Sequence, residues 1–283
     1  MNYVKTAVLL AVLTGMLIVF GGLIGGRSGM AVALVLAGLM NFITYWFSDK
    51  IVLAMYGAKE VAQGDAPVLW GTVNRLALAA GMPMPRVYMM ENEAPNAFAT
   101  GRNPKHAAVA VTTGIMKLLN QQELEGVIGH ELAHIRNRDI LIATVAATIA
   151  GAISYLSHMA YYASLFGGGS RDDDRGSNPL VSIVMMIVAP LAAMIIQMAI
   201  SRSREYGADN AGARIAGNPI YLANALRKLD YYNKRIPMEG INQSASALLI
   251  VSPLSGGGLL KIFSTHPPIE ERIQRLEAMR GAM

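Results

Sequence analysis

Four long stretches without Asp, Glu, Lys or Arg dominate this sequence. Two of them contain 21 residues each, a third contains 31, and a fourth contains 26 with a proline near its middle. About 20 apolar residues in a helix are enough to cross roughly 30 Å of hydrocarbon. The sequence therefore predicts four transmembrane helices, over Thr6–Gly26, Ser28–Ser48, Ile140–Ser170 and Gly176–Ser201. The last two contain His158 and Gln197, so they could instead pack against each other inside the protein.

Composition agrees with a membrane protein. Apolar residues make up 53% of the 283 residues, charged residues make up only 15%, and the mean hydropathy is +0.37. The formal net charge of +5 is modest, and no Lys/Arg run is interleaved with aromatic residues, so nucleic acid is not an expected partner. The chain has no Cys and therefore no disulfides, which fits soluble parts that face the cytoplasm.

Positive charges beside the four stretches predict the orientation in the membrane. Cytoplasmic flanks are enriched in Lys and Arg, and one side of the stretches carries seven of these residues against three on the other. The richer side contains Lys5, Lys50, Lys59, Arg136, Arg138, Arg202 and Arg204, and the poorer side contains Arg27, Arg171 and Arg175. Both termini are therefore expected in the cytoplasm, together with the segment between the second and third stretches.

This arrangement divides the chain into four parts. We expect a membrane hairpin over residues 1–48, a soluble part over 49–139, a second membrane hairpin over 140–201 and a second soluble part over 202–283. In the first soluble part, Asp65 is expected to cap a helix that runs to about Ala80. Short strands are expected over Arg86–Met90 and Ala107–Thr113, with 97–100 between them. The predicted fold class is α+β and mainly helical.

The run His-Glu-Leu-Ala-His at positions 130–134 carries the strongest chemical signal. His130 and His134 lie one turn apart on one face of a helix, so that their imidazoles can bind a single ion. Glu131 can take the proton of a metal-bound water. Asn120 and Glu123 form the pattern of a capping box, which favours a helix here. Two ordinary surface histidines on a helix are the alternative interpretation.

A catalytic zinc ion needs three protein ligands, so one more is required. Because the chain has no Cys, the third ligand must be His, Asp or Glu. Glu205 follows the fourth stretch by four residues, at the membrane face where the histidines lie. Asp209, one turn further along, is a candidate hydrogen-bond partner for a ligand His. Taken alone, these residues also fit an ordinary charged helix face.

The order of motifs resembles a known family. The histidine motif, a long apolar hairpin, Glu-Tyr-Gly-Ala-Asp at 205–209 and Thr-His-Pro-Pro at 265–268 are similar to the HtpX family of membrane zinc metalloproteases, which is related to the CAAX prenyl protease family. The resemblance covers essentially the whole chain. It implies a gluzincin-like zinc metalloprotease domain in which His130, His134 and Glu205 hold one Zn²⁺ and Glu131 is the catalytic base.

The same resemblance implies further site residues. His266 and Arg272 correspond to family residues that face the active site and support the tetrahedral intermediate, where a cation stabilises an oxyanion. His266 could instead simply enter the final helix. The segment Asn96, Ala97, Phe98 and Ala99 resembles a substrate-binding edge strand, which holds an extended peptide by main-chain hydrogen bonds. An ordinary short strand or loop is the alternative.

Together these features predict a membrane-integrated zinc metalloendopeptidase. The resemblance implies a multi-pass protein of the bacterial inner membrane whose cytoplasmic catalytic part cleaves damaged or misfolded membrane proteins. Its partners would be polypeptide substrates and the lipid bilayer. One alternative is a narrow processing protease of the CAAX type, although four spans are few for the enclosed chamber this requires. Another is a catalytically silent membrane scaffold or chaperone, against which the intact motif and Glu205 argue.

Overall fold

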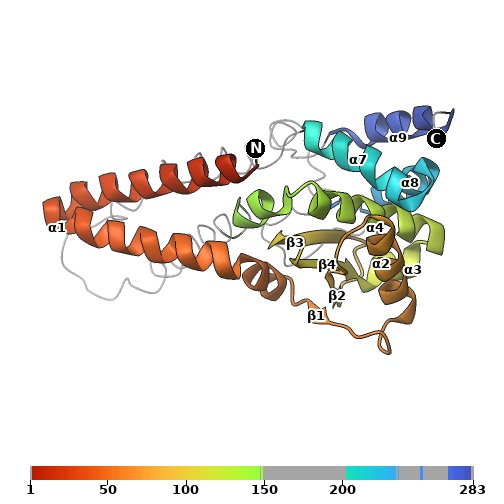
Figure 1. Ribbon diagram of the computed structural model, residues 1–283, viewed down its shortest axis with the longest axis horizontal. Coiled ribbons are helices and arrows are strands. Elements are labelled where there is room, and N and C mark those ends of the chain that lie inside the picture. Colours follow the sequence, from red (N-terminus) through yellow and green to blue (C-terminus); the bar gives the residue numbers. More distant parts are fainter. Residues whose placement is uncertain are drawn as a thin grey trace, which may run out of the picture.

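The computed structural model describes residues 2–146, 148, 202–233, 235, 249–250 and 267–281. A long helical hairpin extends from one end of this part of the chain, and a small sheet and several packed helices form the other end (Figure 1). The mainly helical α+β class is confirmed for these residues.

The hairpin is formed by α1 (Asn2–Met55), which reverses direction at Gly26. Gly26 has φ 58°, a left-handed conformation that glycine adopts without steric cost. The two arms approach closely, because a Cβ on Gly21 would lie 2.4 Å from the carbonyl oxygen of Gly29. These arms correspond to the first two uncharged stretches, and the second arm continues past Ser48 to Met55.

One helical segment in the described part of the chain, Gly26–Met55, is long and apolar enough to cross a membrane. Its side chains are mostly exposed, among them Val32, Leu36 and Phe42. Apolar side chains exposed around a helix suit contact with lipid. The third and fourth predicted spans lie mostly outside the described residues, apart from a buried helical start at 140–146.

The sheet contains four strands in the order β1-β2-β4-β3. β2 and β4 are parallel, whereas the β1–β2 and β3–β4 pairs are antiparallel. The bounds are β1 (Lys59–Glu60), β2 (Arg86–Met90), β3 (Ala97–Asn103) and β4 (His106–Thr112). The strand predicted at 86–90 is confirmed, and the one at 107–113 is shifted by one residue. β3 is longer than predicted and lies at the edge of the sheet.

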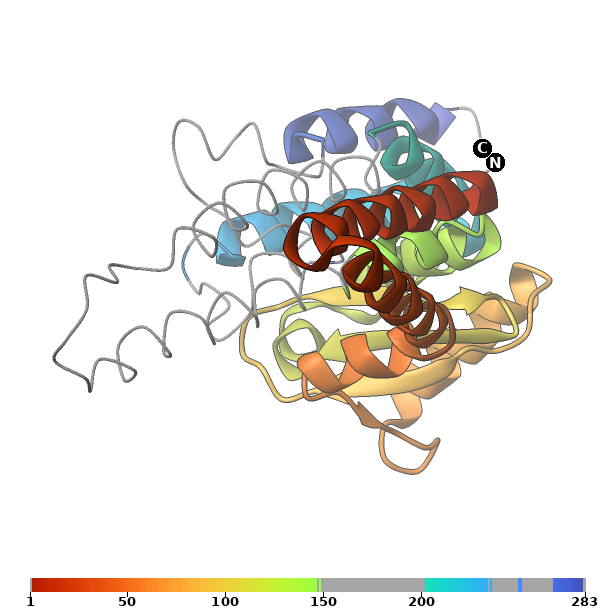
Figure 2. The same ribbon diagram turned by 90° about the vertical axis from the view of Figure 1, so that its left-hand side faces the viewer.

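Both faces of the sheet are covered, because side chains alternate along each strand. One face packs against helices and the other against the end of α1 (Figure 2). The helix-facing residues include Val87, Ala97, Ala99, Val109 and Val111. The opposite face holds Tyr88, Met90, Phe98, Ala108 and Ala110 together with Val52 and Leu53 of α1. The α1 hairpin is thereby joined to the sheet through a shared apolar cluster.

The remaining elements are helical. They are α2 (Pro67–Ala79), α3 (Thr113–Leu118), α4 (Gln121–Arg136), α7 (Arg202–Ala216), α8 (Pro219–Asn233), α9 (Ile269–Ala278) and the 3₁₀ turn η3 (Met279–Gly281). The cap predicted for α2 is wrong, because Ala66 occupies that position and the Asp65 carboxylate accepts from the Ala62 N–H instead. The capping box of α4 is confirmed, with both Asn120–Glu123 hydrogen bonds at 2.9 Å.

Candidate metal centre

Close packing of α4 against α7 positions the site. A Cβ on Gly212 of α7 would lie 2.7 Å from the backbone of His130, and a Cβ on Gly129 of α4 would lie 2.7 Å from the Gly212 oxygen. The absence of side chains at these two glycines lets the helices approach and brings Glu205 beside the histidine motif. Neither glycine was predicted as part of the site, because the sequence shows only a small residue on each helix.

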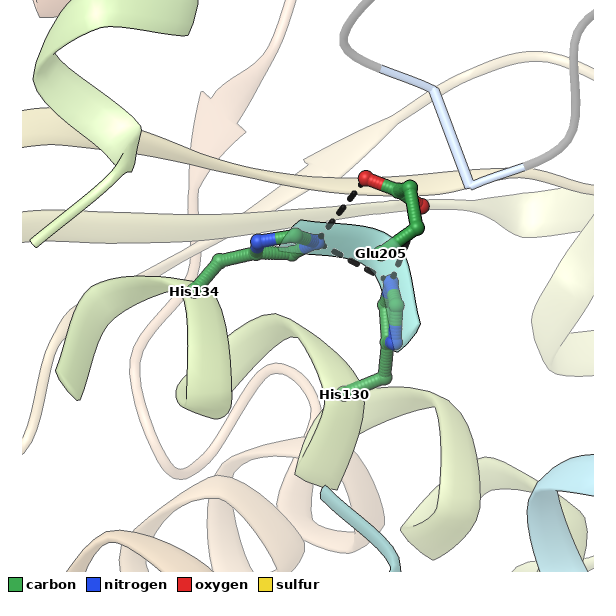
Figure 3. A group of neighbouring side chains, drawn as sticks. All are labelled: His130, His134 and Glu205. Atoms are coloured by element: carbon green, nitrogen blue, oxygen red, sulfur yellow. Dashed lines mark hydrogen bonds and ion pairs between the residues drawn. The ribbon is translucent and has the colours of Figure 1, made fainter. Parts of the chain in front are cut away.

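Three potential ligands converge between the two helices. His130 and His134 project from α4 and Glu205 projects from α7 toward them (Figure 3). The two Nε2 atoms are 3.1 Å apart. His130 Nε2 lies 3.8 Å from Glu205 Oε2, and His134 Nε2 lies 3.6 Å from Glu205 Oε1. The structure therefore brings the three predicted ligands together.

These separations fit a tetrahedral metal ion. Bonds of about 2.0–2.2 Å at tetrahedral angles place two ligand atoms roughly 3.3 Å apart. The ligand atoms of His130, His134 and Glu205 all lie within 4.8 Å of one another. Two imidazoles and one carboxylate are a donor set of catalytic zinc sites, which leave a fourth position open. The residues present thus fit a catalytic zinc ion.

Each histidine also contacts an aspartate through its second nitrogen. His130 Nδ1 lies 2.9 Å from Asp209 Oδ1. His134 Nδ1 lies 3.1 Å from Asp139 Oδ2. Such carboxylates orient a ligand imidazole. The contact of Asp209 was expected. That of Asp139 was missed, although this residue lies only three positions beyond the end of α4.

Arg272 of α9 lies against the ligands and is fully buried. Its Nε and Nη2 donate to the two oxygens of Asp209 at 2.9 and 2.7 Å. Its Nη1 lies 3.8 Å from Glu205 Oε2 and donates to the Ile250 carbonyl at 3.2 Å. These contacts favour a role in positioning the ligands, while contact with the substrate intermediate stays a prediction. His266, the other predicted catalytic residue on this segment, lies outside the described residues.

Glu131 is buried beside the ligands, with 3% of its surface exposed. Burial raises the pKa of its carboxyl group to about 7, against an opposing effect of the charge on His134. The backbone N–H of Ala99 donates to this carboxylate. A pKa near neutrality suits a group that must both accept and release a proton.

The ligands themselves titrate differently. Burial lowers the pKa of His130, so this imidazole is neutral and ready to bind a metal ion. Burial also lowers the pKa of His134, but the charge and hydrogen bond of Asp139 outweigh it and raise that pKa to about 10. Metal binding must therefore displace a proton from His134.

The predicted substrate segment forms the start of β3. The backbone carbonyl of Asn96 accepts from the N–H of Thr112, the last residue of β4. Hydrogen-bonded pairs alternate along an antiparallel ladder, so the backbone groups of Ala97 and Ala99 point away from β4, toward the open edge of the sheet. The Ala97 carbonyl accepts from the N–H of Ile250 at 3.0 Å. The side chain of Phe98 points to the opposite face, against Tyr56. Any contact of this segment with a peptide would therefore fall on the backbone.

The sequence comparisons agree with this site. The model of peptidase family M48 matches residues 65–280, which include all the site residues above. The chain belongs to peptidase family M48. This M48 metalloprotease is 58% identical over 280 residues to a protease HtpX homologue of Syntrophotalea carbinolica and 62% identical over 279 residues to one of Thermodesulfovibrio yellowstonii. In both cases 99% of each chain is covered, so the predicted HtpX family is confirmed.

The fold of this M48 metalloprotease is also similar to a solved structure. The crystal structure of S. mikatae Ste24p matches with a TM-score of 0.51 and 15% sequence identity. The match covers 98% of this chain and spans 65% of the length of Ste24p. At that identity the likeness concerns the fold alone.

Proposed function

We propose that this metalloprotease is a membrane-integrated zinc endopeptidase that cleaves damaged or misfolded membrane proteins at the cytoplasmic face of a bacterial inner membrane. The observation that carries the proposal is the convergence of His130, His134 and Glu205 beside Glu131 and the edge of β3. One Zn²⁺ per chain would occupy this site, and four spans would hold the protein in the bilayer.

The chain supplies the parts needed for peptide hydrolysis. A zinc ion bound by the three ligands would polarise the scissile carbonyl and acidify a bound water. Glu131 would accept the proton of that water and pass it to the leaving amine. The substrate would lie in an extended conformation along the edge of β3, where it would replace contacts such as the one between the Ile250 N–H and the Ala97 carbonyl. Asp209 and Asp139 would keep the two imidazoles oriented.

Two further residues have proposed roles near the reaction. Arg272 would hold Asp209 in place and lend positive charge to the side of the site where Glu205 lies. His266 would stabilise the tetrahedral intermediate, as the family resemblance implies.

The position of the site relative to the apolar segments supports action close to the bilayer. His134 precedes the third uncharged stretch by only six residues, and α4 ends between them at Arg136. Glu205 follows the fourth stretch by four residues, or about 6 Å. Peptide segments that emerge from the membrane would therefore reach the site.

A direct test uses the full chain purified in detergent. We expect about one zinc per chain and cleavage of casein, a loosely folded polypeptide. The Glu131→Gln variant should bind zinc equally and lose cleavage, since an amide cannot accept the proton of the water. Cut sites mapped by mass spectrometry in a model membrane protein should lie in cytoplasmic loops and near span ends. Cuts confined to the middle of spans would contradict the proposed location.

A further inference from the structure

A cavity of about 660 Å³ lies where the second arm of α1 meets the sheet. It is distinct from the metal centre, since it contains none of the metal ligands. One wall comes from α1 and includes Phe42, Trp46 and Lys50. The other comes from β2 and the β3–β4 hairpin and includes Arg86, Arg102 and Lys105.

The α1 wall is aromatic and lies at the end of an apolar segment. Phe42, Trp46 and Phe47 are 55%, 45% and 42% exposed, although all three are large and apolar. They occupy the last turns of the second uncharged stretch, and the first charged residue after it is Asp49. Aromatic side chains at the end of a span gather at the boundary between hydrocarbon and headgroups. The cavity therefore opens at the depth of the lipid phosphates.

The rest of the lining is strongly cationic. Lys50, Arg86, Arg102 and Lys105 contribute positive charges, against the single carboxylate of Asp49. Asp49 is already paired with Arg86 at 3.0 Å. Within the described ranges, the other three cations have no acidic partner. The described part of the chain therefore leaves a positive charge in the cavity that its own carboxylates do not neutralise.

Aromatic contacts hold two of these cations in place. The Arg102 guanidinium lies 4.2 Å from the centre of the Trp46 ring, and Lys50 Nζ lies 5.6 Å from that of Phe47. A cation over an aromatic face is oriented by the ring without losing its charge. The donors of Arg102 are therefore preorganised for an oxyanion, and a guanidinium suits the paired oxygens of a phosphate.

We propose that this cavity binds the phosphate headgroup of an anionic phospholipid. The acyl chains would lie along the exposed apolar face of α1, which continues directly from the cavity through Phe42 and Leu39. That continuity favours a lipid over a soluble anion, because only a lipid would cover both surfaces. Basic pockets beside membrane helices on the cytoplasmic side are suited to such headgroups.

The same strand connects this cavity to the metal centre. Arg102 lies three residues after Ala99, about 10 Å along β3 at the usual strand rise. At the end of this segment that borders the metal centre, the backbone N–H of Ala99 donates to Glu131. A bound headgroup would therefore fix the depth and orientation of the strand that borders the site, independently of which peptide is cleaved.

The test is lipid binding by the full chain in detergent, measured by native mass spectrometry. Dioleoyl-phosphatidylglycerol and dioleoyl-phosphatidylcholine are titrated at equal concentration. We expect one site selective for phosphatidylglycerol in the wild type. Arg102→Gln with Lys105→Gln should weaken that site roughly 10- to 30-fold, at about 1 kcal/mol for each basic residue near an anionic surface. Lys117→Gln with Arg280→Gln removes the same charge at the far end of the molecule and should leave it unchanged (Figure 1).

Several results would overturn the proposal. One is equal binding of phosphatidylglycerol and phosphatidylcholine by the wild type. Another is an equal loss of phosphatidylglycerol binding in the cavity double variant and in the charge-matched control. Displacement of phosphatidylglycerol by inorganic phosphate or by a soluble oligoglutamate peptide at similar concentration would reveal a general anion site instead. If the double variant does not fold, Lys105→Gln alone serves, because this side chain is exposed. It should weaken binding about fivefold, and unchanged binding would refute the assignment.

Discussion

Asp209 and Arg272 form a bidentate ion pair next to the metal ligands, with N–O distances of 2.9 and 2.7 Å. Both side chains are buried, and Asp209 also lies 2.9 Å from His130. Burial alone would raise the pKa of Asp209, but Arg272 and His130 lower it to about 2. The carboxylate is therefore charged at any pH at which the enzyme works, and α9 is attached to the metal centre through it.

Loss of this pair should affect both zinc affinity and stability. Asp209→Asn should weaken zinc binding by roughly 10- to 100-fold, since a partner of the ligand His130 is altered. It should also destabilise the fold by about 3–5 kcal/mol, because buried Arg272 loses the carboxylate to which its Nε and Nη2 donate. Competition with a fluorescent chelator measures the zinc affinity, and urea unfolding measures the stability.

The exposed Arg227–Glu277 pair, which also joins α8 to α9, provides a control. Glu277→Gln should lower the free energy of unfolding by less than about 1 kcal/mol. Equal effects of the two variants would contradict a special role for the buried pair.

Glu205→Ala should remove most zinc affinity, because it deletes one of three ligands. We expect a larger loss than in Asp209→Asn under limiting zinc, measured by metal analysis after gel filtration. Glu270→Ala, an exposed acidic residue on α9, is a suitable control. Full zinc occupancy in Glu205→Ala would rule out this ligand.

Zinc binding should release a proton. The pKa of His134 is about 10 without the metal ion, so this imidazole is protonated at pH 8 and must be deprotonated to bind. At least one proton per zinc is expected at pH 8, one from His134 and a further contribution from any zinc-bound water, and the apparent affinity should rise with pH up to about pH 10. Calorimetric titrations in two buffers with different ionisation enthalpies measure this number. Heats that do not depend on the buffer would mean that His134 is already neutral.

Glu131→Gln should stabilise the metal-free protein at alkaline pH. The pKa of Glu131 is raised to about 7 in the fold, so keeping it buried costs free energy once the unfolded chain ionises above its ordinary pKa. This cost is absent below about pH 4.5, grows between pH 4.5 and 7, and is fully present above pH 7, on the order of 3 kcal/mol. Urea unfolding of both proteins with chelator at pH 5 and pH 8 tests the sign. A glutamine variant that is less stable than wild type at pH 8 would contradict it.

Gly212→Ala should disturb the metal centre although residue 212 binds nothing. Its new Cβ would lie 2.7 Å from the backbone of His130, so α7 must move away from α4 and take Glu205 with it. We expect a cost of about 1–3 kcal/mol from overpacking, and weaker zinc binding. Gly207→Ala lies on the same helix, has no neighbour within 4 Å of its new Cβ and should be neutral or slightly stabilising. Normal zinc affinity in Gly212→Ala would show that the helix contact does not set the ligand geometry.

The sequence by itself determined the parts of this protein that depend on local pattern. The uncharged stretches predicted the α1 hairpin, and the Asn120–Glu123 pattern predicted the start of α4, because spans and caps involve residues that are close in the chain. The spacing of His130 and His134 placed them on one helix face for the same reason. Helical periodicity was therefore enough to predict two of the ligands.

Only the tertiary structure decided how these parts meet. Glu205 reaches the histidines because Gly129 and Gly212 let two helices touch, a contact between residues more than 80 positions apart. The family resemblance predicted Arg272 at the site, but its pairing with Asp209 requires α9 to pack against α7. The turn after α4 decides that Asp139 returns to His134. The sequence also could not predict that Arg102 would lie over Trp46, because their contact requires the β3–β4 hairpin to fold back against α1. Contacts between distant segments depend on how whole elements pack, and spacing along the chain carries no record of that.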